Sequence, residues 1–341
     1  MTSLSHHYYS HHRTFEQSLD VVYPTVAFAG PPLPLVVLVV GSGWLGHRFF
    51  VYAGTSWWNS SAPKTIASLG AVCVCVRHRG AFPPVSVPTL VVLATIAGLV
   101  SLFQVGLAWP SVALASAVFA IMWLLWSAAA QGSATYEEML EDVATALVWV
   151  RDNRAALPAH GPQLIFGGYS SGGHVAIGLL NRPDVLTAHG LPSCVSELCD
   201  GVLLVSGVLA TRPAAATTSP RWFTDFWNRF VWGPASGRLP SPIHELECNA
   251  QWRQASAVPP HLLVGCAKEV FGWDVANVYF CSQAYASVLK NKGSPVRYVE
   301  IDSNHWSVLN SKALCQALRL ELRTNGWPDR DKIRSHNRKA S

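Results

Sequence analysis

The apolar residues of this chain gather in short runs that are separated by helical patterns. Six of these runs are mostly continuous rather than alternating with polar residues: Leu35–Val40, Ala71–Val76, Gln163–Phe166, Val202–Val205, His261–Val264 and Val296–Ile301. Continuous apolar runs of this length are typical of strands that are buried on both faces of a parallel sheet. We therefore predict a strand at each of the six runs.

Helical patterns lie between the predicted strands. Met139, Val143 and Leu147 repeat at helical spacing after an acidic first turn, which suits the positive end of a helix dipole. A later helix is expected over residues 274–291, because Gly293 supplies a C-terminal stop. The alternation of strand and helix predicts an α/β fold with a mainly parallel central sheet.

A long uncharged segment interrupts this alternation. Between Gly80 and Tyr136 there is no Asp, Glu, Lys, Arg or His. The segment holds two apolar stretches that are each long enough to cross a bilayer, since about 20 helical residues span the hydrocarbon core. A very short connection at Trp109 and Pro110 joins them. We expect a transmembrane helical hairpin over residues 85–131, inserted into a catalytic domain formed by residues 21–84 and 133–326. The alternative is a pair of buried core helices, but neither stretch shows the polar stripe of a soluble helix.

The two termini are polar, and the charge of the chain is modest. Residues 1–20 are expected to form a flexible arm, and residues 327–341 a basic tail that carries much of the net charge of +5. No basic stripe is interleaved with aromatic residues, so the sequence does not indicate a nucleic-acid partner. It indicates no oligomeric state either.

The eight cysteines include no C-x-x-C pair. Cys73 and Cys75 alternate within one predicted strand, where they share a face but are poorly placed to form a disulfide. Reduced cysteines favour a catalytic domain that faces the cytosol. Arg77 and Arg79, just before the apolar segment, favour the same side of a membrane such as that of the endoplasmic reticulum.

A nucleophile motif lies between a predicted strand and a predicted helix. Gly168-Tyr169-Ser170-Ser171-Gly172 fits the pattern G-x-S-x-G, which in this context forms a sharp turn that exposes the central hydroxyl. A motif centred on Ser171 would need glycine where Tyr169 stands. Ser170 is therefore the candidate nucleophile, and Ser171 is expected to donate its backbone N–H to a developing oxyanion. The alternative is a glycine-rich turn that only caps the helix.

A second set of oxyanion donors is expected after an earlier strand. Ser42 and Gly43 follow the apolar run that ends at Val40. Their small side chains leave room for backbone N–H groups to point into the site. An ordinary Gly/Ser turn is the alternative at this position.

A serine nucleophile needs a base, which a carboxylate in turn orients. His305 follows the last predicted strand and is the candidate base. The acid is expected after the run His261–Val264, where Glu269 and Asp274 both qualify. Glu269 is nearer the end of the strand, whereas Asp274 could instead cap the following helix.

Several stretches resemble those of the α/β-hydrolase superfamily, and within it the esterases that include prenylcysteine methylesterases, arylformamidases and carboxylesterases of the hormone-sensitive-lipase type. The stretches are LPLVVLVVGSGWLGH, GAVCVCVRHRGAFPP, FGGYSSGGHVA, LPSPIHEL and SNHWSVL. The chain departs from the frequent family pattern at Val40 and Ser42, where His and Gly are common, and at His78, where Tyr is common. Its acid loop is one residue longer than usual.

The resemblance implies a nucleophile at Ser170, a general base and acid at His305, and an orienting carboxylate at Glu269. It also implies ester hydrolysis through an acyl-enzyme, with no metal or organic cofactor. With the apolar hairpin, this suggests a membrane-anchored serine esterase acting on an amphiphilic ester, such as a prenylcysteine methyl ester or a lipid or short acyl ester, beside a lipid bilayer. Two alternatives remain: hydrolysis of an amide or formamide, and a catalytically silent hydrolase fold that serves as a membrane-tethered binding protein.

Overall fold

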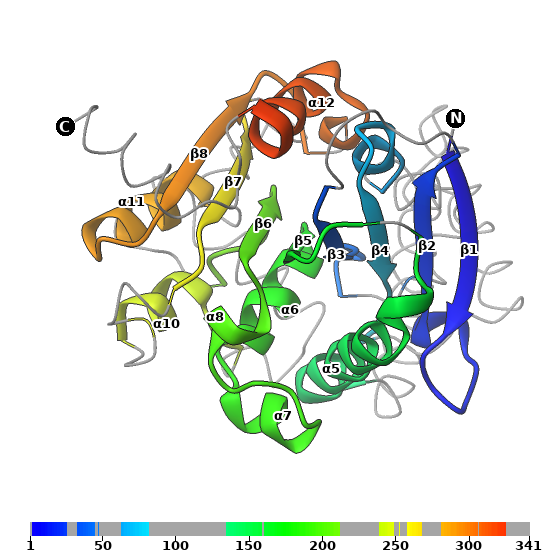
Figure 1. Cartoon of the computed structure of the whole chain (residues 1–341). Helices are drawn as coiled ribbons and strands as arrows, with labels where there is room; N and C mark the ends of the chain where they lie inside the picture. The colour runs from blue at the N-terminus through cyan, green and yellow to red at the C-terminus, as the bar shows by residue number, and fades with distance from the viewer. Residues whose placement is uncertain are drawn as a thin grey trace, which may run out of the picture.

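The computed structural model describes residues 2–25, 33–44, 47, 63–81, 134–158, 160–211, 239–248, 252, 258–267, 281–305 and 307–324. One eight-stranded sheet runs through this part of the chain, in the order β1-β2-β4-β3-β5-β6-β7-β8 (Figure 1). The strands are β1 (Thr2–Tyr8), β2 (Ser18–Pro24), β3 (Leu35–Val39), β4 (Val72–Val76), β5 (Leu164–Tyr169), β6 (Gly201–Val205), β7 (His261–Cys266) and β8 (Val296–Ile301). The six strands from β3 to β8 pair parallel with one another, which confirms the predicted α/β class.

Each predicted apolar run corresponds to one of the parallel strands, and the largest difference in bounds is at β5. The run was expected to end at Phe166, but the strand continues to Tyr169. Gly167 interrupts the apolar run, yet it belongs in the strand because a Cβ there would lie 1.7 Å from the carbonyl oxygen of Leu203 on β6. The glycine therefore permits close strand pairing, and β5 leads without interruption into Ser170.

Helices cover both faces of the sheet. On one face lie α5 (Tyr136–Asn153), α6 (Ser171–Leu180), α7 (Pro183–Ala188), α8 (Val195–Leu198), α10 (Pro242–Cys248) and α11 (Ser282–Asn291). On the other face α12 (Lys312–Arg319) packs together with residues 63–69 (Figure 1). Short helical turns complete the described elements: η1 (Phe15–Gln17), η3 (Arg154–Ala156), η8 (Val308–Asn310) and η9 (Leu320–Thr324). Every residue of α6 is buried.

The expectation of a flexible arm over residues 1–20 is wrong. β1 pairs antiparallel with β2, and β2 pairs antiparallel with β4, so this region extends the sheet at one edge (Figure 1). Leu19 and Val21 of β2 are fully buried. The histidine-rich composition of β1 concealed its strand character, because an edge strand with one exposed face tolerates polar side chains.

The expected hairpin (residues 85–131) and the basic tail (residues 327–341) lie outside the described residues. So does the first part of the helix expected over 274–291, of which the structure describes α11. Among the described residues no helix is both long enough and apolar enough to cross a membrane. The residues that flank the apolar segment are hydrogen-bonded to each other: the N–H of Ala134 donates to the carbonyl oxygen of Gly80 at 3.1 Å.

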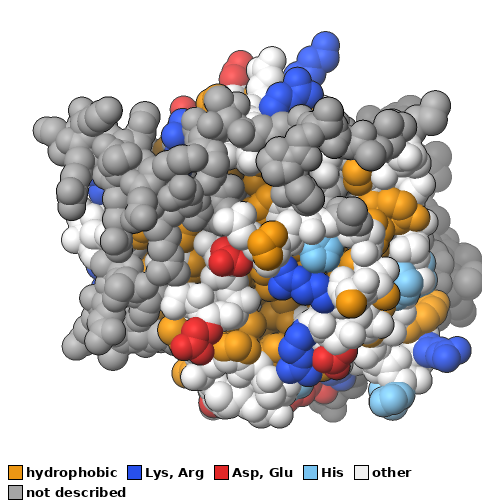
Figure 2. All heavy atoms as spheres, viewed as in Figure 1, with side chains coloured by type: hydrophobic (Ala, Val, Ile, Leu, Met, Phe, Trp, Pro, Cys, Tyr) orange, Lys and Arg blue, Asp and Glu red, His pale blue; other side chains and the backbone are white. Residues whose placement is uncertain are grey.

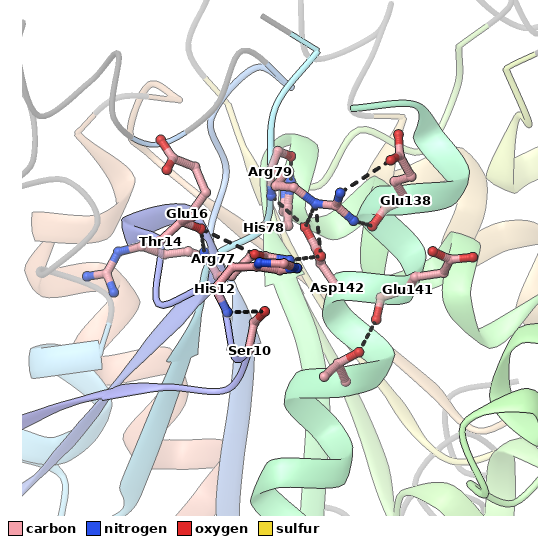
Figure 3. Close-up of polar contacts among 12 residues, drawn as sticks. Ser10, His12, Thr14, Glu16, Arg77, His78, Arg79, Glu138, Glu141 and Asp142 are labelled. Carbon is pink, nitrogen blue, oxygen red and sulfur yellow. Dashed lines mark hydrogen bonds and ion pairs between the residues drawn. The ribbon is translucent and has the colours of Figure 1, made fainter. Parts of the chain in front are cut away.

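Ionic contacts reinforce this junction (Figure 3). The side chain of Arg79 reaches α5, where its Nε lies 2.9 Å from Oδ2 of Asp142 and its Nη1 lies 3.2 Å from Oε1 of Glu138. The buried Asp142 carboxylate also accepts hydrogen bonds from the backbone N–H of Arg79 at 2.8 Å and from Nε2 of Gln17 at 2.9 Å. A reciprocal cap between Thr135 and Glu138 starts α5 at the same place. Residues 79–80 and the start of α5 are therefore held next to each other.

None of the eight cysteines, which all lie in the described part of the chain, forms a disulfide. Cys73 and Cys75 are buried on β4, as expected of reduced core residues. Burial raises the pKa of Cys75 to about 12, so its thiol stays protonated.

On the face drawn in Figure 2, basic and acidic side chains are interspersed with hydrophobic ones.

Candidate active site

Ser170 lies at the sharp turn between β5 and α6. Its backbone has φ 56° and ψ −131°, a conformation that costs free energy for a residue with a side chain. The N–H of Ser170 donates to the carbonyl oxygen of Val205 at 3.2 Å, which holds the turn against β6. Gly41 packs directly on the serine, because a Cβ at position 41 would lie 2.5 Å from the Cβ of Ser170. The surrounding chain therefore fixes the strained turn that the motif predicts.

His305 reaches the serine from the loop that follows β8. Its Nε2 lies 3.0 Å from Oγ of Ser170, which is hydrogen-bond distance. The side chain is buried, and burial lowers the pKa of His305 to about 3. The imidazole is therefore neutral near pH 7 and can accept a proton at Nε2 when the hydrogen is on Nδ1. The structure brings together these two residues, which the sequence places 135 positions apart.

The other ring nitrogen of His305 contacts a residue that the sequence analysis missed. Nδ1 lies 3.0 Å from Oγ of Ser206, which directly follows β6. Ser206 is fully buried, and Sγ of Cys266 at the end of β7 donates to its Oγ at 3.5 Å. Glu269 and Asp274, the two candidate acids, lie outside the described residues.

The loop after β3 is tied to the start of α6. The backbone N–H groups of Ser42 and Trp44 both point to Oγ of Ser171, at 2.9 Å and 3.3 Å. Gly43 and Trp44 have φ values of 61° and 62°, so the loop turns back sharply at this point. The N–H of Ser42 is thus engaged by Ser171. Within the part of the chain that the structure describes, the N–H groups of Gly43 and Ser171 donate to no protein acceptor.

A buried histidine, His174, contacts the loop after β3 through Trp44. Nδ1 of His174 on α6 accepts a hydrogen bond from Nε1 of Trp44 at 3.2 Å, and its Nε2 donates to the carbonyl oxygen of Pro240 at 2.9 Å. Burial lowers the pKa of His174 to about 4, so the ring is neutral and can accept from the indole. Through this histidine, α6 fixes the position of Trp44 as well as that of the nucleophile turn.

Several solved structures have a fold similar to that of this chain. Esterase B from Lactobacillus rhamnosis matches with a TM-score of 0.58 at 15% identity, covering 99% of this chain and 88% of that chain. An esterase from Pyrobaculum calidifontis matches with a TM-score of 0.53 at 17% identity, covering 90% and 81%. A truncated carbohydrate esterase from gut microbiota matches with a TM-score of 0.55 at 13% identity, covering 94% of each chain.

The chain has an α/β-hydrolase fold. No protein-family model and no curated protein sequence matches it. In the hydrolase fold the nucleophile follows a central parallel strand and the histidine follows the last strand. Ser170 after β5 and His305 after β8 occupy these two places.

Two polar residues of the site, Ser206 and His174, could not be found from sequence motifs. Ser206 stands at the carboxyl end of a parallel strand, where functional side chains of α/β proteins gather, and this position was the only signal for it. His174 lies in an apolar helix, where a histidine usually belongs to the core. Neither residue fits a short motif, because each acts on a residue that is distant in sequence.

Proposed function

We propose that this chain is a serine hydrolase that cleaves carboxylic esters through an acyl-enzyme on Ser170. The observation that carries the proposal is the 3.0 Å contact between Oγ of Ser170 and Nε2 of the buried His305, at a turn with a strained, non-glycine backbone. A serine hydroxyl is a poor nucleophile near neutral pH, so a neutral imidazole at this distance is the feature it needs. The esterase fold of the matched structures supports the same reaction class.

The reaction follows from these positions. His305 takes the proton of the Ser170 hydroxyl at Nε2 while Oγ attacks the acyl carbon of the ester. The carbonyl oxygen becomes an oxyanion, which the N–H groups of Gly43 and Ser171 can stabilise. The imidazolium then returns its proton to the departing alcohol oxygen, leaving the acyl group on Ser170. Water, deprotonated by His305, attacks the acyl-enzyme, and the serine regains its proton as the carboxylic acid leaves.

A carboxylate from the loop after β7 completes the proposed machinery. Glu269 lies three positions beyond Cys266, the last residue of β7. Because Cys266 contacts Ser206, which contacts His305, β7 ends on the same side of the sheet as the imidazole. This supports Glu269 as the orienting acid, with Asp274 as the alternative five positions further along the chain.

The proposed substrate is an amphiphilic ester held at a membrane. The support comes from the uncharged sequence between Gly80 and Tyr136, in which residues 85–131 form the proposed transmembrane hairpin. The bond between Ala134 and Gly80 supports an insertion whose two ends meet at one point of the domain. A hydrophobic tail that stays in the bilayer would raise the local concentration of the ester group at the site. The absence of a disulfide among the eight cysteines supports a domain that faces the cytosol.

Labelling with a fluorophosphonate probe tests the hydrolase proposal. The probe reacts with an activated serine, so wild-type protein should be labelled and Ser170→Ala should not. Ser171→Ala is the matched variant, since it removes the neighbouring hydroxyl and leaves the nucleophile. Labelling that persists in Ser170→Ala, or a folded wild-type protein that is never labelled, would overturn the proposal. The second result, together with no turnover of short acyl esters or formamides, would favour the catalytically silent alternative.

Carbonate extraction of membranes tests the anchor separately. The full-length chain should remain in the pellet, and a variant that lacks residues 85–130 should be released. The deletion leaves Phe82, Pro83, Pro84, Gln131, Gly132 and Ser133 to bridge the hydrogen-bonded junction. The released variant should still react with the probe. A full-length chain that is extracted as readily as the deletion variant would refute the hairpin.

A further inference from the structure

Ser206 contacts Nδ1 of His305, the ring nitrogen that does not face Ser170. Its Oγ lies 3.0 Å from Nδ1 of His305 and accepts from Sγ of Cys266 at 3.5 Å. The side chains of all three residues are buried, so water does not compete for these contacts. Burial raises the pKa of the Cys266 thiol, which keeps its hydrogen available for donation.

The orientation of His305 depends on what contacts Nδ1. A neutral imidazole carries one hydrogen, and the reaction requires it on Nδ1 so that Nε2 can accept the proton of Ser170. The hydroxyl of Ser206 has two lone pairs, one for the Cys266 thiol and one for Nδ1–H. When His305 becomes an imidazolium, Nδ1–H must still donate, and the Ser206 oxygen is in place to accept it.

We propose that Ser206 is a positioning residue, whose hydroxyl accepts the Nδ1–H of His305 and holds Nε2 toward Ser170. This inference rests on the proposed hydrolase function. It gives His305 a neutral hydrogen-bond acceptor in addition to the carboxylate that the fold is expected to supply. Glu269 or Asp274 can contact the imidazole as well, because the proposal depends only on the observed contact between Ser206 and Nδ1.

The backbone at Ser206 indicates that the position is held in place. Its φ is 46°, in the left-handed region that a serine enters at a cost, and its N–H donates to the carbonyl oxygen of Val264 at 2.8 Å. Asparagine tolerates this region better than most residues and carries a side-chain acceptor, whereas glycine adopts it with no side chain at all. The site therefore offers three informative substitutions: Ser206→Ala, Ser206→Gly and Ser206→Asn.

Steady-state kinetics on a short acyl ester and the rate of fluorophosphonate labelling test the proposal. Ser206→Ala and Ser206→Gly should lower kcat about 10- to 100-fold, the range expected when a buried hydrogen bond to the imidazole is lost, with KM within about twofold of wild type. The kcat of Ser206→Asn should lie at least halfway, on a logarithmic scale, between that of Ser206→Ala and that of wild type. Ser206→Gly relieves the backbone strain, so it gives a folded protein with no hydroxyl even if the alanine variant does not fold.

Ser294→Ala is the control, because Ser294 is another buried serine and its hydroxyl has no hydrogen-bond partner among the residues that the structure describes. It should leave kcat unchanged. If the folded Ser206 variants label and turn over at the wild-type rate, Ser206 does not position His305 and the inference is overturned. If wild type itself is not labelled, the proposed function fails instead, so the two failures can be told apart. A loss that asparagine does not recover, accompanied by a comparable rise in KM, would assign Ser206 a purely structural role.

Discussion

Tyr169 and His305 stack face to face, with ring centroids 5.0 Å apart and planes inclined by 17°. The Tyr169 hydroxyl donates to the carbonyl oxygen of the same histidine at 2.8 Å. Because Tyr169 directly precedes Ser170, one dipeptide at the end of β5 supplies both the hydroxyl that His305 faces and the surface on which its ring rests. Tyr169 thus helps to place His305 beside the nucleophile that directly follows it in the chain.

Tyr169→Phe should keep the stacking and lose the hydrogen bond to His305. Leaving a buried carbonyl unsatisfied costs about 1–3 kcal/mol, so we expect a lower free energy of unfolding and a labelling rate reduced about tenfold. Tyr285→Phe is the matched control, since Tyr285 is fully buried and its hydroxyl forms no hydrogen bond within the described part of the chain. Urea unfolding and probe labelling measure both effects. Equal behaviour of the two variants would contradict a specific role for the Tyr169 hydroxyl.

Ser171→Ala should slow the reaction without preventing labelling. The change removes the acceptor for the N–H groups of Ser42 and Trp44, which frees the loop that carries Gly43. Loss of an oxyanion donor costs about 100- to 1,000-fold in kcat, and loosening a loop should cost less than that, about 10- to 100-fold. KM should change little. An unaltered kcat on short acyl esters would show that the loop needs no tether to Ser171.

Asp142→Ala should destabilise the domain by about 1–3 kcal/mol, because it removes the acceptor of the buried Gln17 amide and of the partly exposed Arg79 side chain. Asp152→Ala is the control. Asp152 lies on α5 like Asp142, but it pairs with the neighbouring Arg151 at the surface. Loss of this exposed pair should cost about 0.5 kcal/mol or less. The free energy of unfolding in urea measures the difference. Similar values for the two variants would contradict a structural role for the junction at Arg79.

Stability should fall as the pH is lowered from about 6.5 to about 4. Burial lowers the pKa of His174 and His261 to about 4 and that of His305 to about 3, whereas histidine in the unfolded chain titrates near 6.5. In this window the unfolded state binds protons that the folded state excludes, so acid favours unfolding. Each such histidine contributes about 1.4 kcal/mol per pH unit.

His261→Phe isolates one of these groups at a distance from the nucleophile. The aromatic ring should preserve packing against Trp252 and Tyr285, while the titration at position 261 is removed. Urea unfolding at several pH values between 7 and 5 should then give a pH dependence smaller by about one proton. A slope identical to that of wild type would contradict the assignment of this acid sensitivity to His261.

The centre of the sheet could be predicted from the sequence because β3, β4, β6 and β7 are buried along their whole length and therefore consist mainly of apolar residues. β8 has the predicted bounds, from Val296 to Ile301. β1 could not be predicted in the same way. An edge strand needs only one apolar face, and a stretch rich in His, Ser and Tyr gives little signal for it.

At the site, motif spacing and chain order were enough to predict that Ser170 and His305 would meet. The same reasoning could not find Ser206, because its role depends on a contact with His305 across 99 positions of sequence. It also could not foresee that the N–H of Ser42 would be engaged by Ser171. That contact depends on the hand of the turn at Gly43 and Trp44, and sequence spacing does not specify the hand.

Trapping the acyl-enzyme tests the central claim most directly. A short acyl ester is mixed with the protein, the reaction is quenched in acid during turnover, and the peptide that contains Ser170 and Ser171 is analysed by mass spectrometry. We predict that the peptide gains the mass of the acyl group, that fragmentation places it on Ser170, and that Ser170→Ala abolishes the adduct while Ser171→Ala does not. Ester turnover that continues in Ser170→Ala, or an acyl group found on another residue, would contradict the account.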